Sequence, residues 1–418
     1  MEKLRSLTGL VVCVCLVWAA PARADVVSDW NAITVLYVGG GPGTPPSPPV
    51  GRAGPPGLLD IALVHLAIHD AVQAIEGRFQ PYYYSDPTQL GVGSLEAAVA
   101  AAAHRTLVLL YPGQQGPLDT LYNNYLTANS IDTMDPGLAV GDAAANALHA
   151  NHYRPVIAVA DFFGGTGAGE WRSAVSLTFQ YLADSEPFTL NRVSQFRPQP
   201  PPPLNSVVYA REYDEVKALG NSAAQSSLQL TVGRFWSGNF VAQWNEAMRR
   251  IADAQLLDVG DSARLFALAN TAGADAAMAV WESKRFYNFW RPITAIQNGD
   301  NDLNAKTVGD VSWTTFFGTP NYPDYVSGAN GLTGAFTGML ELFFGTDEMD
   351  FSVKSIPAQA ANPERFYTRF SQAAQEVVDA RILLGIHFRA ADEEARRLGN
   401  RVSHWAFQKF LRPVPGSK

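Results

Sequence analysis

The part of this chain that follows its first 24 residues contains no cysteine. The only two cysteines among the 418 residues, Cys13 and Cys15, fall within an apolar run near the N-terminus. That run begins after two basic residues and ends at Ala22-Arg23-Ala24, a small-x-small sequence typical of a cleaved export signal. We therefore expect a secreted or periplasmic protein. After cleavage it could form neither a disulfide nor a thiolate metal site.

The chain is also short of basic residues and of long apolar segments. Its 31 Lys and Arg are outnumbered by 39 Asp and Glu, which gives a formal net charge of −8, and the predicted signal would remove more basic than acidic residues. An acidic surface argues against nucleic acid or anionic lipid as a general partner. The N-terminal apolar run is too short to cross a bilayer, and no later segment is expected to do so. The sequence leaves open whether the protein is a homo-oligomer.

Many segments of the sequence show the apolar periodicity of an α-helix. Hydrophobic residues make up 47% of the chain, and in many segments they recur about one helical turn apart. The segments predicted as helices are 58–75, 94–110, 136–150, 210–219, 242–256 and 261–285, followed by helices after Ser327, from near Pro363 and from near Asp392. No strand alternation or internal repeat is evident. The predicted fold class is all-α, built from helical bundles.

A proline-rich segment divides the chain. Residues 198–203 read Pro-Gln-Pro-Pro-Pro-Pro, which favours a stiff extended connector. We expect a signal peptide at 1–24, an N-terminal helical half with this connector at 25–204, and a C-terminal helical bundle at 205–418. The C-terminal bundle carries the residues with the strongest chemical signal.

Several short motifs imitate ligand sites but lack essential members. The glycine clusters at 39–43 and 164–169 have no Lys-Ser/Thr ending and no βαβ context, so we interpret them as loops. Residues 300–311 begin like a calcium loop but have Ala305 and Val311 where glycine and glutamate are required, which favours a turn. His65 and His69 are four residues apart on a helix without the glutamate of a zinc motif. We predict that both are buried within the bundle.

One stretch, residues 284–292, gathers Lys284, Arg285 and Arg291 among four aromatic residues. Arginine grips a tetrahedral oxyanion by parallel hydrogen bonds, and lysine adds a point charge. Because a helix usually ends before a proline, Pro292 places Lys284 near a helix end and Arg291 at a turn, with both reaching one pocket. Taken alone, the stretch is explained equally well by a solvated charged face.

Two later stretches supply further oxyanion-binding groups. Ser327 and Gly328 precede an apolar helix, where free backbone amides form an anion site, although a plain helix cap explains them as well. Arg381 and His387 lie six residues apart at a helix junction. A lone histidine is more often structural than catalytic.

Together the three stretches resemble the vanadium-dependent haloperoxidases and the related type 2 phosphatidic acid phosphatases. The shared pattern is Lys, six residues, Arg-Pro; then Pro-Ser-Gly-His; then Ser-Arg, five residues, His. The chain matches it at these positions: Lys284, Arg291 and Pro292; Ser327 and Gly328; Arg381 and His387. Residues 63–72 also look like an early helix of bacterial haloperoxidase-like proteins, so the resemblance covers most of the chain.

The resemblance implies a role for each matching residue. Lys284, Arg291 and Arg381 would neutralise the oxygens of vanadate, or of phosphate as its isostere. Ser327 and the Gly328 amide would add hydrogen bonds. His387 would bind vanadium in a peroxidase, or become a phosphohistidine in a phosphatase.

The departures from the pattern concern proton transfer. Ala329 occupies the place of the second-motif histidine, which is the general acid–base group, while Val326 and Ala380 replace a proline and a serine. A positioned acid or base contributes roughly 10²–10⁴-fold in rate. The phosphatase route suffers more from its loss, because it must expel an alkoxide.

Three functions follow as hypotheses. The first is an exported vanadate-dependent haloperoxidase-like enzyme that uses hydrogen peroxide to oxidise bromide or iodide in preference to chloride. The second is an acid phosphatase acting on a phosphoester through a phosphohistidine at His387. The third is an oxyanion-binding relic that has lost its acid–base group at Ala329.

Overall fold

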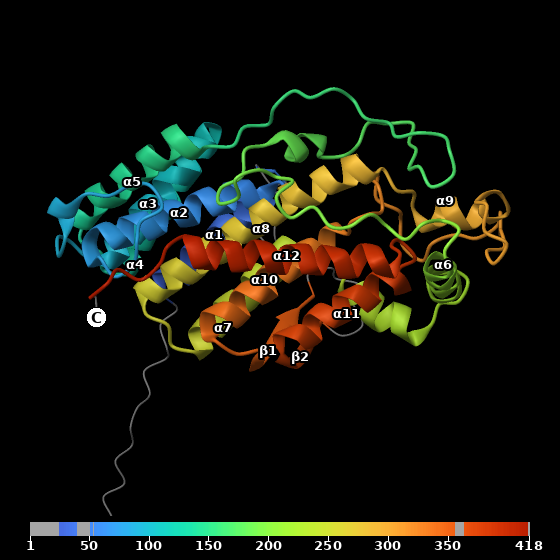
Figure 1. Ribbon diagram of the computed structural model, residues 1–418. Helices are drawn as coiled ribbons and strands as arrows, with labels where there is room; N and C mark the ends of the chain where they lie inside the picture. Colours follow the sequence, from blue (N-terminus) through green and yellow to red (C-terminus); the bar gives the residue numbers. More distant parts are fainter. Residues whose placement is uncertain (1–24, 40–50, 53, 356–362, 417–418) are drawn as a thin grey trace, which may run out of the picture.

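The computed structural model describes residues 25–39, 51–52, 54–355 and 363–416 (Figure 1). The predicted signal at 1–24 and most of the first glycine cluster lie outside this part. The described chain is mainly helical, which confirms the predicted all-α class. Its helices are α1 (Val26–Gly39), α2 (Gly57–Glu76), α3 (Leu95–Leu110), α4 (Gln115–Ala128), α5 (Pro136–His152), α6 (Val207–Leu219), α7 (Phe240–Ala254), α8 (Val259–Tyr287), α9 (Pro292–Gln297), α10 (Gly328–Phe344), α11 (Phe370–Leu383) and α12 (Arg389–Lys409).

Helix ends follow the capping chemistry of the sequence. The Ser94 hydroxyl accepts a hydrogen bond from the Ala97 amide at the start of α3, and the Asp258 carboxylate accepts one from the Asp261 amide at the start of α8. Gly77 ends α2 in the left-handed conformation, at φ 71°. The segment at 115–128, which has too few apolar residues to be predicted, forms α4 on the outside of the first half.

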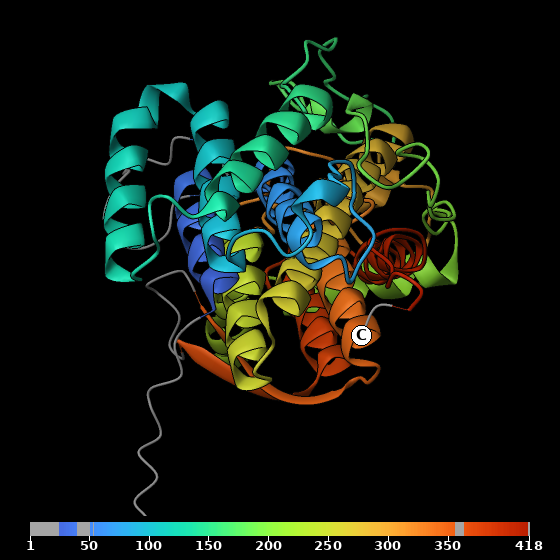
Figure 2. The ribbon, with the colours of Figure 1, turned by 90° about the vertical axis from the view of Figure 1, so that its left-hand side faces the viewer.

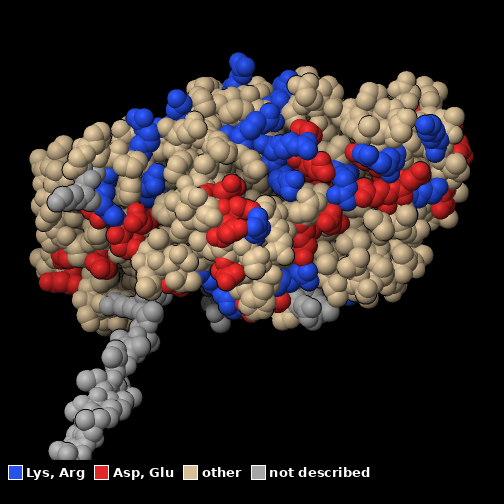
Figure 3. Space-filling view, turned by 60° about the horizontal axis from the view of Figure 1, so that its bottom comes forward, with Lys and Arg blue, Asp and Glu red and all other residues tan. Residues whose placement is uncertain are grey.

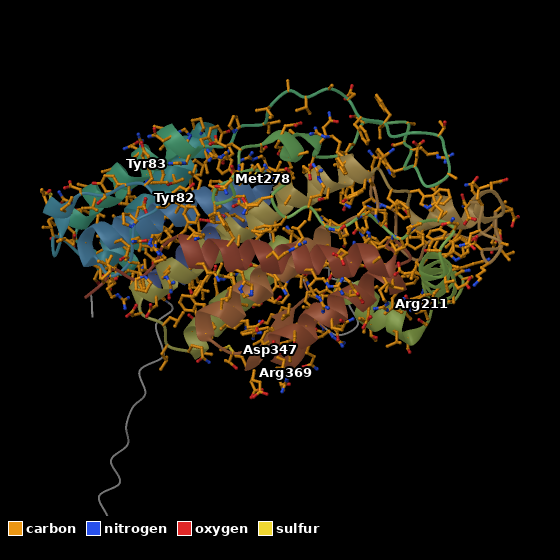
Figure 4. The ribbon with its side chains drawn as sticks, in the orientation of Figure 1. Tyr82, Tyr83, Arg211, Met278, Asp347 and Arg369 are labelled. Atoms are coloured by element: carbon orange, nitrogen blue, oxygen red, sulfur yellow. The ribbon has the colours of Figure 1, made fainter. Side chains whose placement is uncertain are left out.

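The hydrophobic core is continuous across both halves of the chain. Helix α2 packs on α8, α3 and α5, while α10 packs on α12 and α8. In the end-on view teal helices of the first half lie at the left and the red α12 at the right, while blue helices of the first half and yellow helices of the second half share the middle (Figure 2). Met278, in the second half of α8, is fully buried (Figure 4). The position of the boundary between the halves stays a prediction.

Helix α2 is long and apolar enough to cross a membrane by length and composition, and among the described residues it is the only such helix. All of its most apolar window is buried inside the protein. Its apolar character is therefore accounted for by its place in the core. His65 and His69 lie on it and are buried as predicted: His65 Nε2 is 2.8 Å from Asn31 Nδ2, and His69 Nε2 is 3.1 Å from the Gln80 carbonyl oxygen.

Buried carboxylates anchor two segments that lack regular structure. On α8, Asp275 accepts hydrogen bonds from the backbone amides of residues 188, 189 and 190. On α2, Asp70 accepts three in the same way from residues 82–84, and the first two of these, Tyr82 and Tyr83, are labelled in Figure 4. Further along, the Tyr287 hydroxyl donates to the Pro198 carbonyl of the proline-rich connector. The segment that joins the two halves is thereby held over α8.

The structure corrects two sequence predictions. Strands β1 (Glu348–Lys354) and β2 (Glu364–Arg369) form an antiparallel hairpin, where no strand was expected and a helix was predicted from near Pro363. Helix α11 begins only at Phe370. The sequence signal that was missed is the alternation of apolar residues at Phe351 and Val353, both of which are buried. Asp347 and Arg369 mark this hairpin at the edge of the molecule (Figure 4).

The starts of α10 and α12 lie side by side because their surfaces are lined with glycine. A Cβ on Gly334 would come within 2.3 Å of the Arg396 carbonyl oxygen, and a Cβ on Gly399 within 2.2 Å of the Gly331 carbonyl oxygen. The Ser327 amide donates to the Ala391 carbonyl at 2.9 Å. This contact brings the second and third sequence motifs together.

Candidate functional site

Lys284 lies in the last turn of α8 and is fully buried. Its Nζ donates to the backbone carbonyls of Pro323, at 2.7 Å, and Asp324, at 3.2 Å. Burial and the neighbouring Arg291 charge hold the pKa of Lys284 well below its ordinary value. The amine is thus fixed against the loop that leads into α10.

Arg291 reaches the same loop from the other side of a turn. Asn288 follows the last residue of α8 in the left-handed conformation, and Arg291 directly precedes α9, whose first residue is Pro292. The Arg291 guanidinium donates to the Tyr322 carbonyl, at 2.7 Å, and to the Ile386 carbonyl, at 2.6 Å. Lys284 at a helix end and Arg291 at a turn is the arrangement that the sequence predicted.

His387 is paired with a buried carboxylate. Its Nδ1 is 2.8 Å from Asp324 Oδ1, and its Nε2 is 3.1 Å from Arg291 Nη1. Burial, opposed in part by Arg291 and Lys284, raises the pKa of Asp324 well above its ordinary value, while burial lowers that of His387. When Asp324 is ionised, the histidine proton lies on Nδ1, and the lone pair of Nε2 faces Arg291 Nη1, which donates to it.

Arg381 completes a cluster of three buried cations. It lies at the end of α11, with Nη1 donating to the Trp236 carbonyl at 3.0 Å. Two buried nitrogens of the cluster, Arg291 Nη2 and Arg381 Nε, have no hydrogen-bond acceptor among the described residues. Because buried charged donors are costly to leave unpaired, these two atoms indicate a place for an anion.

A cavity of about 300 Å³ opens beside the cluster. Its wall includes Arg381, Tyr322, Gly328 and Ala329, with aromatic side chains from residues 240, 281 and 317. Gly328 and Ala329 line the cavity and belong to the first turn of α10, where backbone amides have no intrahelical acceptor. The methyl group of Ala329 therefore forms part of the wall where the resembled pattern has a histidine.

The structure brings the six predicted residues into one buried region. Sequence reasoning missed two carboxylates there: Asp324, two residues before the second motif, and Asp392, near the start of α12. Neither stands out in sequence, because the contacts of Asp324 with His387 and of Asp392 with Asn330 join distant segments. His404, a further histidine of the C-terminal half, is exposed on α12.

The site's cations are separate from the charges on the surface. On the face in Figure 3, basic and acidic side chains are interspersed. Arg285, a neighbour of Lys284 in sequence, makes an ion pair with Asp184 at the surface. The stretch at 284–292 thus has one solvated cation and two buried ones.

Asp324→Ala is expected to destabilise the fold by about 3–5 kcal/mol, because it leaves the buried charges of Arg291 and Lys284 without their carboxylate. Urea unfolding measures the loss. Asp184→Ala, which breaks the surface pair with Arg285, is the control and should cost no more than about 1 kcal/mol. Added phosphate should restore part of the stability of Asp324→Ala, since it returns negative charge to the cluster. Equal losses in the two variants would contradict this description of the site.

Comparison with known proteins places this geometry in context. Residues 264–416 match a family model described as the VCPO second helical-bundle domain, and this span contains all six predicted site residues. The chain is 28% identical over 184 residues to the vanadium chloroperoxidase of Curvularia inaequalis. That alignment covers 36% of this chain and 30% of the Curvularia protein, so less than a third of the relative is matched.

Solved structures are similar over most of the chain. The first bacterial vanadium-dependent iodoperoxidase has a TM-score of 0.73 at 22% identity, covering 94% of this chain and 97% of that one. The apo form of a bacterial vanadium-dependent chloroperoxidase has a TM-score of 0.69 at 16% identity, covering 84% and 92% of the two chains. At these identities the likeness establishes the fold.

Proposed function

We propose, from the vanadium haloperoxidase fold of this chain and its confirmed resemblance to that family, that it is an exported vanadate-dependent enzyme. Its reaction would be the oxidation of bromide or iodide by hydrogen peroxide. The observation that carries the proposal is the cluster of Lys284, Arg291 and Arg381, whose unpaired buried donors lie beside His387.

The donor set fits vanadate. Two guanidinium groups, one ammonium group and the start of a helix are suited to a tetrahedral oxyanion of high charge. The lone pair of His387 Nε2 offers a neutral nitrogen ligand, and Asp324 holds the ring by the other nitrogen, as outer partners of metal-binding histidines do. Bound vanadate would activate hydrogen peroxide as a Lewis acid.

The protein's own groups would then act as follows. Arg291 and Arg381 would hold the oxyanion and balance its charge, and Ser327 with the Gly328 amide would donate to its oxygens. Lys284, which the loop carbonyls of residues 323 and 324 keep in place, would draw electron density from a neighbouring oxygen. The aromatic wall at Trp281 and Tyr322 would limit water around the reacting atoms.

The absence of an acid–base side chain at Ala329 favours halide oxidation over phosphoester hydrolysis. Lewis-acid activation needs less help from a positioned proton donor than expulsion of an alkoxide does. Chloride is the hardest of the three halides to oxidise. Bromide and iodide are therefore the preferred substrates in this proposal.

The protein loaded with orthovanadate is expected to brominate or iodinate a phenolic dye in the presence of peroxide. His387→Ala should reduce turnover at least about 100-fold, because the neutral nitrogen ligand is lost. His404→Ala, which alters an exposed histidine on α12, should retain wild-type turnover. No turnover with either halide at any pH would overturn the peroxidase proposal.

An acid phosphatase is the second candidate, and the pairing of His387 with Asp324 favours it. A carboxylate that accepts the Nδ1 proton would support nucleophilic attack by Nε2 on phosphorus. The phosphohistidine would form as the bond between phosphorus and the ester oxygen breaks, and the departing alkoxide would become an alcohol by taking up a proton. Trapping with a labelled phosphoester should give an acid-labile adduct that is missing in His387→Ala. An unlabelled wild-type protein would exclude this route.

A further inference from the structure

Asp392 is a buried carboxylate that the proposed chemistry does not use. It lies in the first turn of α12 and has no solvent exposure. Its Oδ1 accepts a hydrogen bond of 2.8 Å from Asn330 Nδ2, while its Oδ2 has no partner among the described residues. Asn330 follows Ala329 on α10. The carboxylate is therefore hydrogen-bonded to the residue next to position 329, where the resembled pattern has an acid–base histidine.

Asp392 also lies beside a predicted oxyanion ligand. The Ser327 amide donates at 2.9 Å to the carbonyl of Ala391, the residue before Asp392, and Ser327 Oγ is itself buried without a hydrogen-bond partner in the described chain. Ser327 does not use its hydroxyl to cap α10. Two unpaired buried oxygens, one hydroxyl and one carboxylate, therefore stand together at the start of this helix.

A serine hydroxyl has only one hydrogen to donate. If Asp392 is ionised, the carboxylate attracts that hydrogen, and Ser327 turns its lone pairs toward the cation cluster. If Asp392 is protonated, its own O–H can donate to Ser327 Oγ, and the serine hydrogen is free for an oxyanion. Only the second arrangement makes Ser327 a donor to the ligand.

We propose that Asp392 is a positioning residue whose proton decides whether Ser327 donates a hydrogen bond to the bound oxyanion. This inference rests on the oxyanion site of the proposed function and adds a proton that is taken up from solvent when the oxyanion binds. At a pH above the pKa of Asp392, its carboxylate gains one proton for each oxyanion bound, and no other covalent bond is made or broken.

The surroundings of Asp392 set the pH at which this happens. Burial raises its pKa to about 7, and Ser327, Arg381, Asn330 and Arg389 oppose that rise. Lys284, Arg291 and Asp324 on the other side of the site also feel its charge. From the α6 side, Glu212 accepts a hydrogen bond from the Ala390 amide, and Glu215 pairs with Arg389. Above about pH 7 the carboxylate form predominates, so oxyanion binding should weaken as the pH rises.

The test uses tungstate, a tetrahedral dianion that does not titrate near neutral pH, so that any proton taken up belongs to the protein. Calorimetry on the purified protein, in two buffers of different ionisation enthalpy, measures affinity and proton uptake together. We expect uptake approaching one proton above about pH 7 and an affinity that falls by up to tenfold per pH unit. Asp392→Asn should remove this uptake and bind tungstate more tightly than wild type at high pH.

Two comparisons distinguish an effect of Asp392 that acts through Ser327 from simple repulsion between the Asp392 carboxylate and the oxyanion. The effect of Asp392→Asn on affinity should largely disappear when it is made in a Ser327→Ala background. Glu212→Gln, which alters a buried carboxylate close to the start of α12, should keep the wild-type pH slope. Thermal unfolding confirms that each variant folds, and Asp392→Glu provides a second titratable variant.

Two outcomes overturn the inference. One is a wild-type pH slope in Asp392→Asn, and the other is an equal effect of that substitution with and without Ser327. A wild-type protein that binds no tungstate at any pH would instead overturn the oxyanion site and with it the proposed function.

Discussion

Replacing Arg291 by alanine is expected to weaken oxyanion binding severely and to reduce turnover with it. Arg291 is fully buried, bridges the Tyr322 and Ile386 carbonyls, and carries an unpaired nitrogen toward the cluster. Charge-assisted hydrogen bonds contribute about 1.5–3 kcal/mol each, so losing the two N–H groups of the unpaired Nη2 should weaken phosphate or vanadate binding by roughly 100-fold or more. Calorimetry with both anions measures the loss.

Two further variants make this result specific to the guanidinium of Arg291. Arg285→Ala removes a cation six residues earlier that pairs with Asp184 at the surface, and it should leave the affinity unchanged. Arg291→Lys keeps the charge but loses the planar fork, and it should recover only part of the binding. An Arg291→Ala protein that is folded and still binds phosphate as tightly as wild type would show that the cluster is not the anion site.

The local part of this site could be predicted because its signals are contained in short spacings. The six residues between Lys284 and Arg291, followed by Pro292, predicted a helix end and a turn, and α8 and α9 have that form. The helical class followed from periodicity in the same way. Such predictions depend on neighbours in sequence, which the sequence shows directly.

The two carboxylates could not be predicted because their partners are distant in sequence. Asp324 meets His387 from 63 residues away, and Asp392 meets Asn330 from 62 residues away. Nothing in the sequence indicates that α10 and α12 approach closely enough for the second contact. That approach depends on glycines such as Gly334 and Gly399, whose packing role appears only in three dimensions. The β1–β2 hairpin was missed because its alternation spans only a few residues.

Ala329→His is expected to raise phosphoester hydrolysis by about 10²–10⁴-fold, while halide oxidation changes by less than about tenfold. Ala329 is half-buried and lines the cavity beside Arg381, so an imidazole placed there has room to extend toward the oxyanion. It would supply the proton that a departing alkoxide requires. Halide oxidation depends mainly on Lewis-acid activation and gains less from the same proton.

Measuring both reactions in one variant separates the three functional hypotheses. Ala329→Gln fills the same space without an acid–base group, and it should leave both rates near those of the wild type. If wild type oxidises halide and Ala329→His adds only phosphatase turnover, the native protein is a peroxidase whose site never needed this histidine. If both activities rise from nothing, the wild-type protein is an oxyanion-binding relic, and the peroxidase proposal fails. If wild type already hydrolyses phosphoesters and the histidine adds nothing, another group donates the proton. Asp392, which is hydrogen-bonded to Asn330, the neighbour of Ala329, is then the first carboxylate to substitute.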